Sequence, residues 1–378
     1  EQLVDEIIKL KKRKRYGLVW EDKPEDVAEI CKTKMPILVE DKDRVIITDK
    51  TKPMNILIEG DNYHALSALN YTHAGKIDVI YIDPPYNTGN KDFRYNDSYV
   101  DREDSYRHSK WLSFMEKRLK IAKKLLKNTG VIFISIDNNE QSQLKILCDE
   151  IFNENNFLTK INRIRTKGGK NDSIHFIDDN DYILIYAKNK QFICINPIRR
   201  KDDISKYNKS DEKGKYKLND LRMHGGADTL VERQNLGYSV YFNKKRNDCK
   251  FLHDFSDDLS YYMEPDQELI KDGYICIRPG IHRGKYGRWR WSTKKFKEEL
   301  ENIHIDIKKK KIYVKVRPKD EIIITPNSNI SILNTEGTNE IYNIFGKKDF
   351  DYPKPTRLIK YLIERYPKKD CIVLDFFA

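Results

Sequence analysis

Long apolar runs are missing from this sequence of 378 residues. No segment approaches the roughly 20 consecutive apolar residues that a helix needs to cross a bilayer. Residues 1–15 are charged and have no apolar centre, so we expect a helical arm there and not a secretory signal. The sequence therefore predicts a soluble, cytoplasmic protein that does not act in a membrane.

Closely spaced cysteines are also missing. The six cysteines are scattered along the chain, and no two of them form a C-x-x-C pair. Such pairs are typical of structural zinc sites and thiol redox centres, and disulfide frameworks belong to secreted proteins. We therefore expect reduced, mostly packed cysteines and no bound metal.

Positive charge, by contrast, is in excess. The chain has 71 Lys and Arg against 59 Asp and Glu, which gives a formal net charge of +12. Basic surfaces bind polyanions such as DNA because binding releases the counterions that surround the phosphates. Hydrophobic residues make up 39% of the chain, and its length allows two domains or one domain with a large insertion.

The segment with the most chemical information is Asp83-Pro84-Pro85-Tyr86. It follows the apolar run 77–82, whose length and β-branched residues predict a buried strand. The two prolines stop the strand, fix their own φ angles and leave free carbonyl groups. A carboxylate, a carbonyl oxygen and an aromatic ring therefore gather at the carboxyl end of a strand, where α/β sheets bind ligands.

These groups suit the methylation of an exocyclic amine. The lone pair of adenine N6 is delocalised into the ring, so an enzyme must hold its N–H groups with acceptors that favour a more tetrahedral nitrogen. Asp83 and the Pro84 carbonyl would be those acceptors, and Tyr86 would stack on a base pulled out of the duplex. The alternative is a Pro-rich turn with a tyrosine at the surface.

The sequence resembles the amino-directed DNA methyltransferases, and more closely the modification subunits of type III restriction systems. The resemblance covers most of the chain and rests on GDN at 60–62, DPPYNTG at 83–89, DFRYND at 92–97, HSKWL at 108–112, residues 130–137 and VLDFFA at 373–378. In this family the last segment opens the Phe-x-Gly-x-Gly loop that binds S-adenosylmethionine, whereas here the chain stops before either glycine. We therefore expect the intact protein to continue past Ala378. The chain as given is expected to bind S-adenosylmethionine weakly or not at all, so truncation can leave it inactive.

The resemblance implies two sets of site residues. The catalytic set is Asp83, Pro84, Pro85 and Tyr86. The set that binds S-adenosylmethionine is Asp61, Asn62, Lys354, Pro355, Thr356, Asp375, Phe376 and Phe377. For Asp61, which follows a predicted short strand at 55–61, a helix cap is an equally good interpretation.

Alternating strands and amphipathic helices predict the fold. The expected elements are a helix from Asn62, a helix from residue 105 to a glycine end at Gly130, a strand at 131–136, a helix at 141–152, a strand at 182–187 and a helix from Thr356. Asp137 and Glu140 have the spacing of a capping box for the helix at 141–152. Repeated strand and helix units indicate a doubly wound, largely parallel α/β sheet. The resemblance makes this the Rossmann-like fold of S-adenosylmethionine-dependent methyltransferases, with an inserted target-recognition region.

The character of the chain changes near residue 191. We expect an N-terminal arm at 1–50, a catalytic core at 51–190, a target-recognition region at 191–340 and a return to the catalytic core at 341–378. Within the third segment the apolar runs become short, and small antiparallel strands are predicted at 312–316 and 322–324. No helix-turn-helix or zinc-finger signature identifies the element that would read the bases.

Two pairs of residues are predicted to contact DNA. Phe93 and Tyr95 lie close in sequence to the Asp83 segment and would help to enclose a flipped base. Arg288 and Arg290 alternate with tryptophans in the target-recognition region and would position phosphate groups.

The expected function is that of a site-specific DNA adenine-N6 methyltransferase. The order of the motifs resembles the β arrangement of these enzymes and indicates the modification subunit of a type III restriction-modification system. Its expected partners are double-stranded DNA and a separate helicase and nuclease subunit, with a homodimer as one option. Two alternatives stay open: a solitary adenine or cytosine-N4 methyltransferase, and a DNA-binding specificity module whose catalytic half is inactive.

Overall fold

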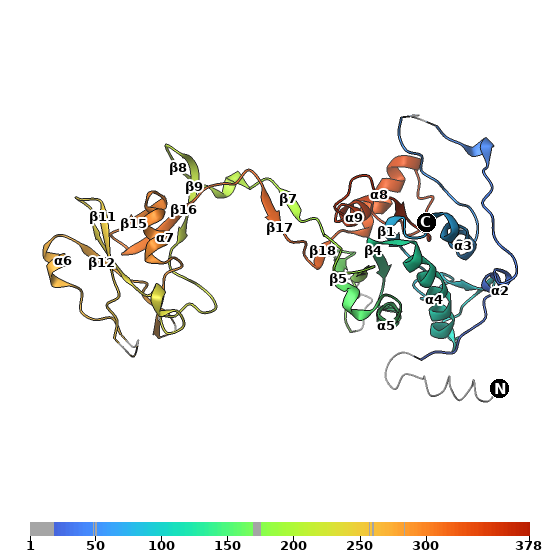
Figure 1. Ribbon diagram of the computed structural model, residues 1–378, viewed down its shortest axis with the longest axis horizontal. Coiled ribbons are helices and arrows are strands. Elements are labelled where there is room, and N and C mark those ends of the chain that lie inside the picture. Colours follow the sequence, from blue (N-terminus) through green and yellow to red (C-terminus); the bar gives the residue numbers. More distant parts are fainter. Residues whose placement is uncertain are drawn as a thin grey trace. The chain divides into compact units, whose positions relative to one another are not determined.

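The chain forms two compact units. The computed structural model describes residues 19–378 except 48, 50, 169–174, 257, 259–260 and 283, so the arm predicted at 1–15 lies outside the described residues. One unit consists of Glu1–Ile198 and Thr325–Ala378, and the other of Arg199–Ile324 (Figure 1). Among the described helices, none combines the length and the apolar character needed to cross a membrane.

The larger unit is built on a six-stranded sheet with the order β18-β5-β6-β4-β1-β19. The strands are β1 (Ile77–Ile82), β4 (Leu126–Ile136), β5 (Phe157–Ile164), β6 (Asn180–Ala187), β18 (Asn329–Ser331) and β19 (Val373–Leu374). β1 is parallel to β4 and β19, and β18 is parallel to β5, whereas β6 is antiparallel to both of its neighbours. The predicted α/β sheet is confirmed, with β6 as an antiparallel strand inside it.

Helices cover both faces of this sheet. Those of the larger unit are α2 (Asp26–Ile30), α3 (Asn62–His73), α4 (Arg107–Leu125), α5 (Gln141–Phe152), α8 (Asn334–Phe345) and α9 (Thr356–Ile363) (Figure 1). Along β1, Ile80 and Ile82 pack into the core under α3, α4 and α5, whereas Val79 and Tyr81 pack into the core under α9. Because both faces are covered, the central strands are mainly apolar on both faces.

Two predicted elements differ in the structure. Residues 55–61 form no strand: they pair with no neighbour, and Ile56 and Leu57 are 76% and 88% exposed. The helix predicted to end at Gly130 ends at Leu125, and Gly130 lies within β4. A side chain at Gly130 would come within 3.1 Å of the Ile77 carbonyl oxygen, so this glycine permits close contact with β1 and does not end a helix.

The return from the second unit to the first occurs at residue 325, earlier than the predicted residue 341. The reason is β18, which extends the sheet by pairing with β5, so that Ile330 lies opposite Arg163. Helix α8 follows within the same unit. Only one of the three residues of β18, Ile330, is apolar, so no hydrophobic pattern indicated this pairing.

The smaller unit is mainly antiparallel sheet. Its elements are β7 (Ile198–Arg200), β8 (Lys209–Asp211), β9 (Gly214–Asp220), β10 (Ser239–Asn243), β11 (Asp248–Leu252), α6 (Gln267–Lys271), β12 (Ile275–Ile277), β13 (Ile281–His282), β14 (Lys285–Tyr286), α7 (Thr293–Glu298), β15 (Ile303–Asp306), β16 (Lys311–Val316) and β17 (Ile322–Ile324). A four-stranded sheet, β15-β16-β9-β8, and a three-stranded sheet, β11-β10-β12, enclose a core that contains Trp289, Phe296 and Ile312. The strands predicted at 312–316 and 322–324 are confirmed as β16 and β17.

Candidate active site

Two carboxyl groups lie at the ends of neighbouring parallel strands. Asp83 directly follows β1 and Asp375 directly follows β19, and these strands are paired through Val79 with Val373 and Ile80 with Leu374. Burial, together with the nearby charge of Asp83, raises the pKa of Asp375 to about 6. The parallel register therefore concentrates negative charge at one sheet edge, where a cation would be stabilised.

Tyr86 and Lys354 surround the Asp83 carboxylate. The Tyr86 hydroxyl group donates a hydrogen bond of 2.9 Å to Asp83 Oδ1, and the Lys354 ammonium group donates one of 2.6 Å to the Tyr86 oxygen. Lys354 Nζ also lies 3.2 Å from Asp83 Oδ1 and 4.8 Å from the centre of the Tyr86 ring. Burial and the charge of Asp83 raise the pKa of Tyr86 well above its usual range, so the hydroxyl keeps its proton.

Hydrogen bonds to residues of α4 hold the loop that follows Asp83. The indole N–H of Trp111, which is fully buried, donates a hydrogen bond of 2.7 Å to the Pro85 carbonyl oxygen. Asn87 has a φ angle of 57°, in the left-handed region, and its side-chain amide donates to the Arg107 carbonyl oxygen at 3.3 Å. These bonds orient the loop because its two prolines leave it few backbone donors of its own.

Replacing Trp111 with phenylalanine tests this anchor. The substitution keeps an aromatic ring in the core but leaves the Pro85 carbonyl oxygen without its donor. We expect the free energy of unfolding to fall by about 1–3 kcal/mol, the cost of leaving a buried polar group unsatisfied. Urea unfolding of the variant beside the original protein measures this; a change under about 0.5 kcal/mol would show that the bond does not hold the loop.

A buried carboxyl group supports the same loop. Glu140 is completely buried, and its Oε1 accepts a hydrogen bond of 2.6 Å from the Asn87 amide and lies 2.6 Å from His108 Nδ1. Burial raises the pKa of Glu140 to about 8, and burial and the charge of Arg107 lower the pKa of His108. Glu140 is the residue before α5 but makes no side-chain cap, so the predicted capping box with Asp137 is wrong. The Glu140 side chain supports the Asp83 loop instead.

Asp61 and Asn62 connect α3 to the rest of the site. Asp61 caps α3 by accepting a hydrogen bond of 2.7 Å from the Tyr63 backbone, as the cap interpretation predicted. Asn62 donates to the Phe376 carbonyl oxygen at 2.9 Å and accepts a bond of 2.5 Å from Arg118. Arg118, itself buried, pairs with Glu25 at 2.7 Å. Asn62 thus ties the end of β19 to α3 and α4.

The comparison with protein families matches this arrangement. The family model described as DNA methylase matches residues 77–378, which include the Asp83 loop and the final motif. This chain belongs to the DNA methylase family.

The sequences of several curated proteins align with most of this chain. The Mod subunit of the type III restriction-modification enzyme EcoPI from Escherichia phage P1 is 35% identical over 373 residues, 90% of this chain and 56% of the relative. The type II methyltransferase M.KpnI from Klebsiella pneumoniae is 36% identical over 324 residues, 84% of this chain and 73% of the relative. The StyLTI Mod subunit from Salmonella typhimurium is 32% identical over 368 residues, 90% of this chain and 51% of the relative. The chain spans about half the length of the two Mod subunits.

The structure corrects two residues that were expected to enclose a base. Phe93 and Tyr95 are only 2% and 8% exposed and belong to the core of the larger unit. The Phe93 ring packs edge-on against Phe114 with 5.2 Å between ring centres, and the Tyr95 hydroxyl donates to the Lys23 carbonyl oxygen at 2.7 Å. Aromatic rings in a polar segment fold inward when apolar neighbours are available, and this polar loop covers such neighbours.

Arg288 also differs from its predicted role. It is 7% exposed, and its guanidinium group donates hydrogen bonds to the backbone oxygens of Ala227 and Trp289. Arg288 therefore holds two parts of the smaller unit together, whereas Arg290 is exposed. Residues 308–311, at the turn from β15 into the first residue of β16, are four exposed lysines of the same basic region.

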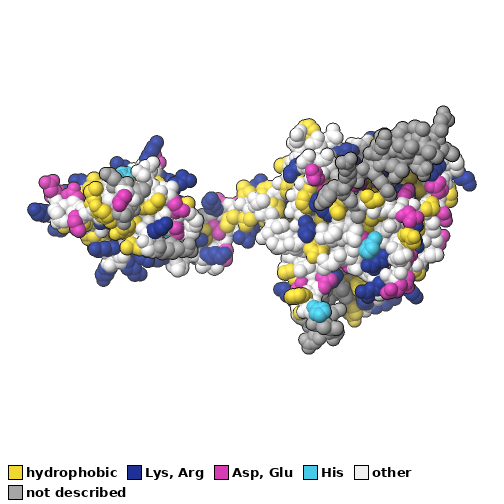
Figure 2. Space-filling model, turned by 90° about the horizontal axis from the view of Figure 1, so that it is seen from below, with side chains coloured by type: hydrophobic (Ala, Val, Ile, Leu, Met, Phe, Trp, Pro, Cys, Tyr) yellow, Lys and Arg dark blue, Asp and Glu magenta, His cyan; other side chains and the backbone are white. Residues whose placement is uncertain are grey.

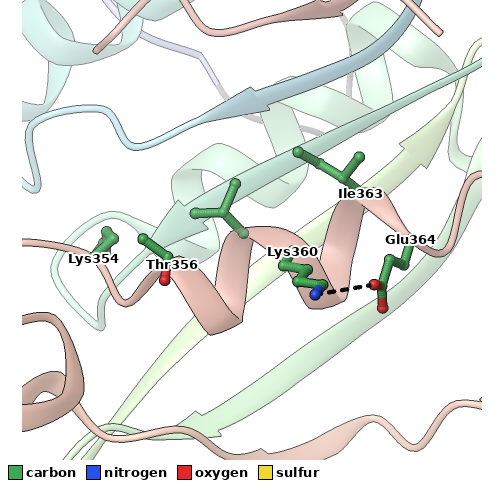
Figure 3. A pocket seen from close by; sticks show the side chains of 6 residues that line it. Lys354, Thr356, Lys360, Ile363 and Glu364 are labelled. Atoms are coloured by element: carbon green, nitrogen blue, oxygen red, sulfur yellow. Dashed lines mark ion pairs between the residues drawn. The ribbon is translucent and has the colours of Figure 1, made fainter. Parts of the chain in front are cut away.

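A hollow of about 460 Å³ lies along α9 (Figure 3). It is lined by Lys354, Thr356, Ile359, Lys360, Ile363 and Glu364, and Lys360 and Glu364 lie 4.0 Å apart as an ion pair. Two of the predicted cofactor residues, Lys354 and Thr356, border this hollow, but neither Asp83 nor Asp375 does. We therefore place the reactive groups at the sheet edge and not in the hollow.

The Lys354 segment is held in place by α8. Glu340 accepts hydrogen bonds from the backbone and hydroxyl of Thr356 at 2.9 and 2.8 Å. Gly337 lies so close that a side chain there would come within 2.5 Å of the Pro353 carbonyl oxygen. This contact makes Gly337 the residue that allows the segment to approach α8.

Replacing Gly337 with alanine should therefore destabilise the protein. Alanine favours a helix over glycine by about 1 kcal/mol, but the close contact with Pro353 should cost about 1–3 kcal/mol. We expect a net loss of stability in thermal unfolding. Asn339→Ala, at an exposed position of the same helix, is the matched control and should be neutral or slightly stabilising. Equal stabilisation by both substitutions would contradict the proposed contact.

Proposed function

We propose that this DNA methylase transfers the methyl group of S-adenosylmethionine to N6 of an adenine in DNA. The observation that carries the proposal is the Asp83 carboxylate with Tyr86 beside it, at the carboxyl end of β1. Asp83 is an acceptor for an N–H group of the target amine. Such a bond orients the nitrogen lone pair toward the incoming methyl group and stabilises the positive charge that develops on nitrogen.

The residues at the sheet edge fit a cationic cofactor. Asp375 and Asp83 lie at adjacent strand ends, and burial together with the charge of Asp83 raises the pKa of Asp375, whereas Lys354 pairs with Asp83. Phe377 borders the same edge and packs against Phe114 and Phe376. When bound, S-adenosylmethionine would supply a methyl group on a positively charged sulfur. Asp375 would hold its cationic end, while Asp83 holds the target and accepts the proton that the amine loses.

The charge of the smaller unit supports a DNA substrate. Residues 199–324 contain 30 Lys and Arg against 21 Asp and Glu, a net charge of +9 out of +12 for the whole chain. Lys and Arg side chains are spread over the surface of this unit, with acidic side chains between them (Figure 2). Phosphate groups would be bound by exposed residues such as Arg290 and the lysines at 308–311. This unit would act as the target-recognition region.

The relatives suggest how the protein is used. Two of the three relatives described above are Mod subunits of type III restriction-modification enzymes, so we include in the proposal a restriction subunit as partner and a cytoplasmic location. A homodimer remains part of the proposal. Co-purification of a large subunit that hydrolyses ATP would distinguish this role from that of a solitary methyltransferase.

The test is methyl transfer followed by nucleoside analysis. Labelled S-adenosylmethionine is incubated with mixed-sequence duplex DNA and this chain, and with any longer natural form of it. We expect label in N6-methyladenine from the longer form and little or none from the 378-residue chain. Label in N4-methylcytosine would instead assign the cytosine reaction, and DNA binding without label in either nucleoside would favour a specificity module.

A further inference from the structure

In the unbound protein, the oxygen atoms proposed to accept from the target amine are already in contact with the side-chain nitrogen of Lys354. The Lys354 ammonium group donates to the Tyr86 oxygen at 2.6 Å and lies 3.2 Å from Asp83 Oδ1. A primary ammonium group and an exocyclic amine both present N–H donors to such acceptors. We infer that Lys354 occupies the position of the target amine in the unbound protein and that an amine-bearing base displaces it. The inference rests on the proposed function of Asp83 as the amine acceptor.

Electrostatics requires Lys354 to leave before methyl transfer. The transition state places positive charge on the amine nitrogen, and a fixed ammonium group on the same carboxylate would repel that charge. Side-chain exposure at this place is low, 18% for Lys354 and 28% for Asp83, so water screens the repulsion only in part. An ammonium group that stayed in place would oppose the reaction that Asp83 promotes.

A second carboxylate lies within reach of the displaced group. Lys354 Nζ is 4.0 Å from Asp181 Oδ2, and Asp181 is almost completely buried. Asp181 is fixed by Arg163, whose guanidinium group donates to both of its carboxylate oxygens. Rotation of the lysine side chain can therefore move the ammonium group from Asp83 to Asp181 without leaving it unpaired.

The backbone of this segment is not expected to move. Gly337 packs against Pro353, and Glu340 binds Thr356, so the residues on both sides of Lys354 are anchored to α8. The exchange is then a rotation of one side chain. It also gives selectivity: a base with an exocyclic amine replaces the lost N–H donor, whereas a base without one leaves Asp83 and Tyr86 short of a donor.

Two nucleosides and two variants test the exchange. The 378-residue chain is titrated with 2′-deoxyadenosine and with the purine deoxynucleoside that has hydrogen in place of the amine, and binding is followed by saturation-transfer NMR. Lys354→Met removes the competing cation and should raise the affinity ratio of the amine-bearing to the amine-free nucleoside about tenfold. Lys354→Arg should lower this ratio, because a guanidinium group binds a carboxylate with two parallel hydrogen bonds. An unchanged ratio in both variants, or no binding of deoxyadenosine to Lys354→Met, would overturn the inference.

A measurement on the unaltered protein covers the case in which a variant does not fold. With ¹³C-labelled lysine, the Lys354 side-chain signal is assigned by its loss in Lys354→Arg or by its shift in Asp83→Asn. Deoxyadenosine should move this signal and the amine-free nucleoside should not; equal effects of the two would reject the exchange. Methyl transfer to DNA is measured in a separate assay. Methyl transfer without a deoxyadenosine-dependent shift of the Lys354 signal would reject only this inference. A shift of the Lys354 signal without methyl transfer would reject only the proposed function.

Discussion

Replacing Asp83 with alanine is expected to lower methyl transfer to DNA by about 10²- to 10³-fold. The carboxylate is the group placed to hold the amine and to stabilise the positive charge on nitrogen, and loss of one such electrostatic partner costs about this much in other enzymes. The side chain is partly exposed and lies at a strand end, so its removal should not unfold the protein. The rate of label incorporation at saturating S-adenosylmethionine measures the effect.

The matched variant is Asp83→Asn. It keeps the shape of the side chain and one acceptor oxygen but removes the charge, so it should retain more activity than alanine if hydrogen bonding contributes independently of charge. DNA binding, measured by gel shift, should be unchanged in both variants, because the proposed phosphate contacts are elsewhere. Activity within threefold of the original protein in Asp83→Ala would place the reaction at another site.

Glu140 should make the protein less stable as the pH rises. Its pKa is raised from 4.5 to about 8 in the folded protein, so the folded state favours the protonated carboxyl group. The stability contributed by this group is complete below pH 4.5 and is lost as the pH rises through about 8. A pKa difference of this size corresponds to about 4–5 kcal/mol, which is an upper bound for the change.

The isosteric variant Glu140→Gln isolates this effect. Glutamine cannot ionise but keeps the one side-chain oxygen that contacts both the Asn87 amide and His108 Nδ1, so its stability should stay nearly constant between pH 5.5 and 8.5. Thermal unfolding is measured at several pH values. The difference in unfolding midpoint temperature between the two proteins should change by several degrees across this pH range. Parallel curves would mean that Glu140 stays ionised inside the protein. Such a result would also require His108 to carry the balancing charge.

Local sequence was sufficient for the parts of the site that depend on one strand and its end. The run 77–82 is buried at every position and apolar at all but Asp78, because both faces of β1 are covered, and two prolines follow it. This combination predicted the strand, its carboxyl end and the position of Asp83. The final motif after β19 was identified from the family resemblance. The predictions for β1 and Asp83 depend on residues that are adjacent in the sequence, because steric contacts between such residues restrict the local backbone conformation.

Side-chain contacts between distant segments could not be predicted in this way. Glu140 and Asp137 have capping spacing, but the choice between a cap and a buried contact depends on Asn87, 53 residues away in the chain. Phe93 and Tyr95 are aromatic residues in a polar segment, and only the packing of Phe114 beneath Phe93 shows that they belong to the core. Neither the residue spacing nor the composition of a segment predicts which other part of the protein will pack against it.

The sequence by itself determined the α/β class, the strand that presents Asp83, and the family to which the chain belongs. Tertiary structure decided what surrounds Asp83. Lys354 lies 268 residues after Tyr86 in the chain. It reaches the Asp83 carboxylate because α9 packs on one face of the sheet and because Gly337 allows the residues before α9 to approach α8 closely. Hydrophobic periodicity specifies which face of an element is buried, but the partner of a charged side chain is set by the register and packing of whole elements.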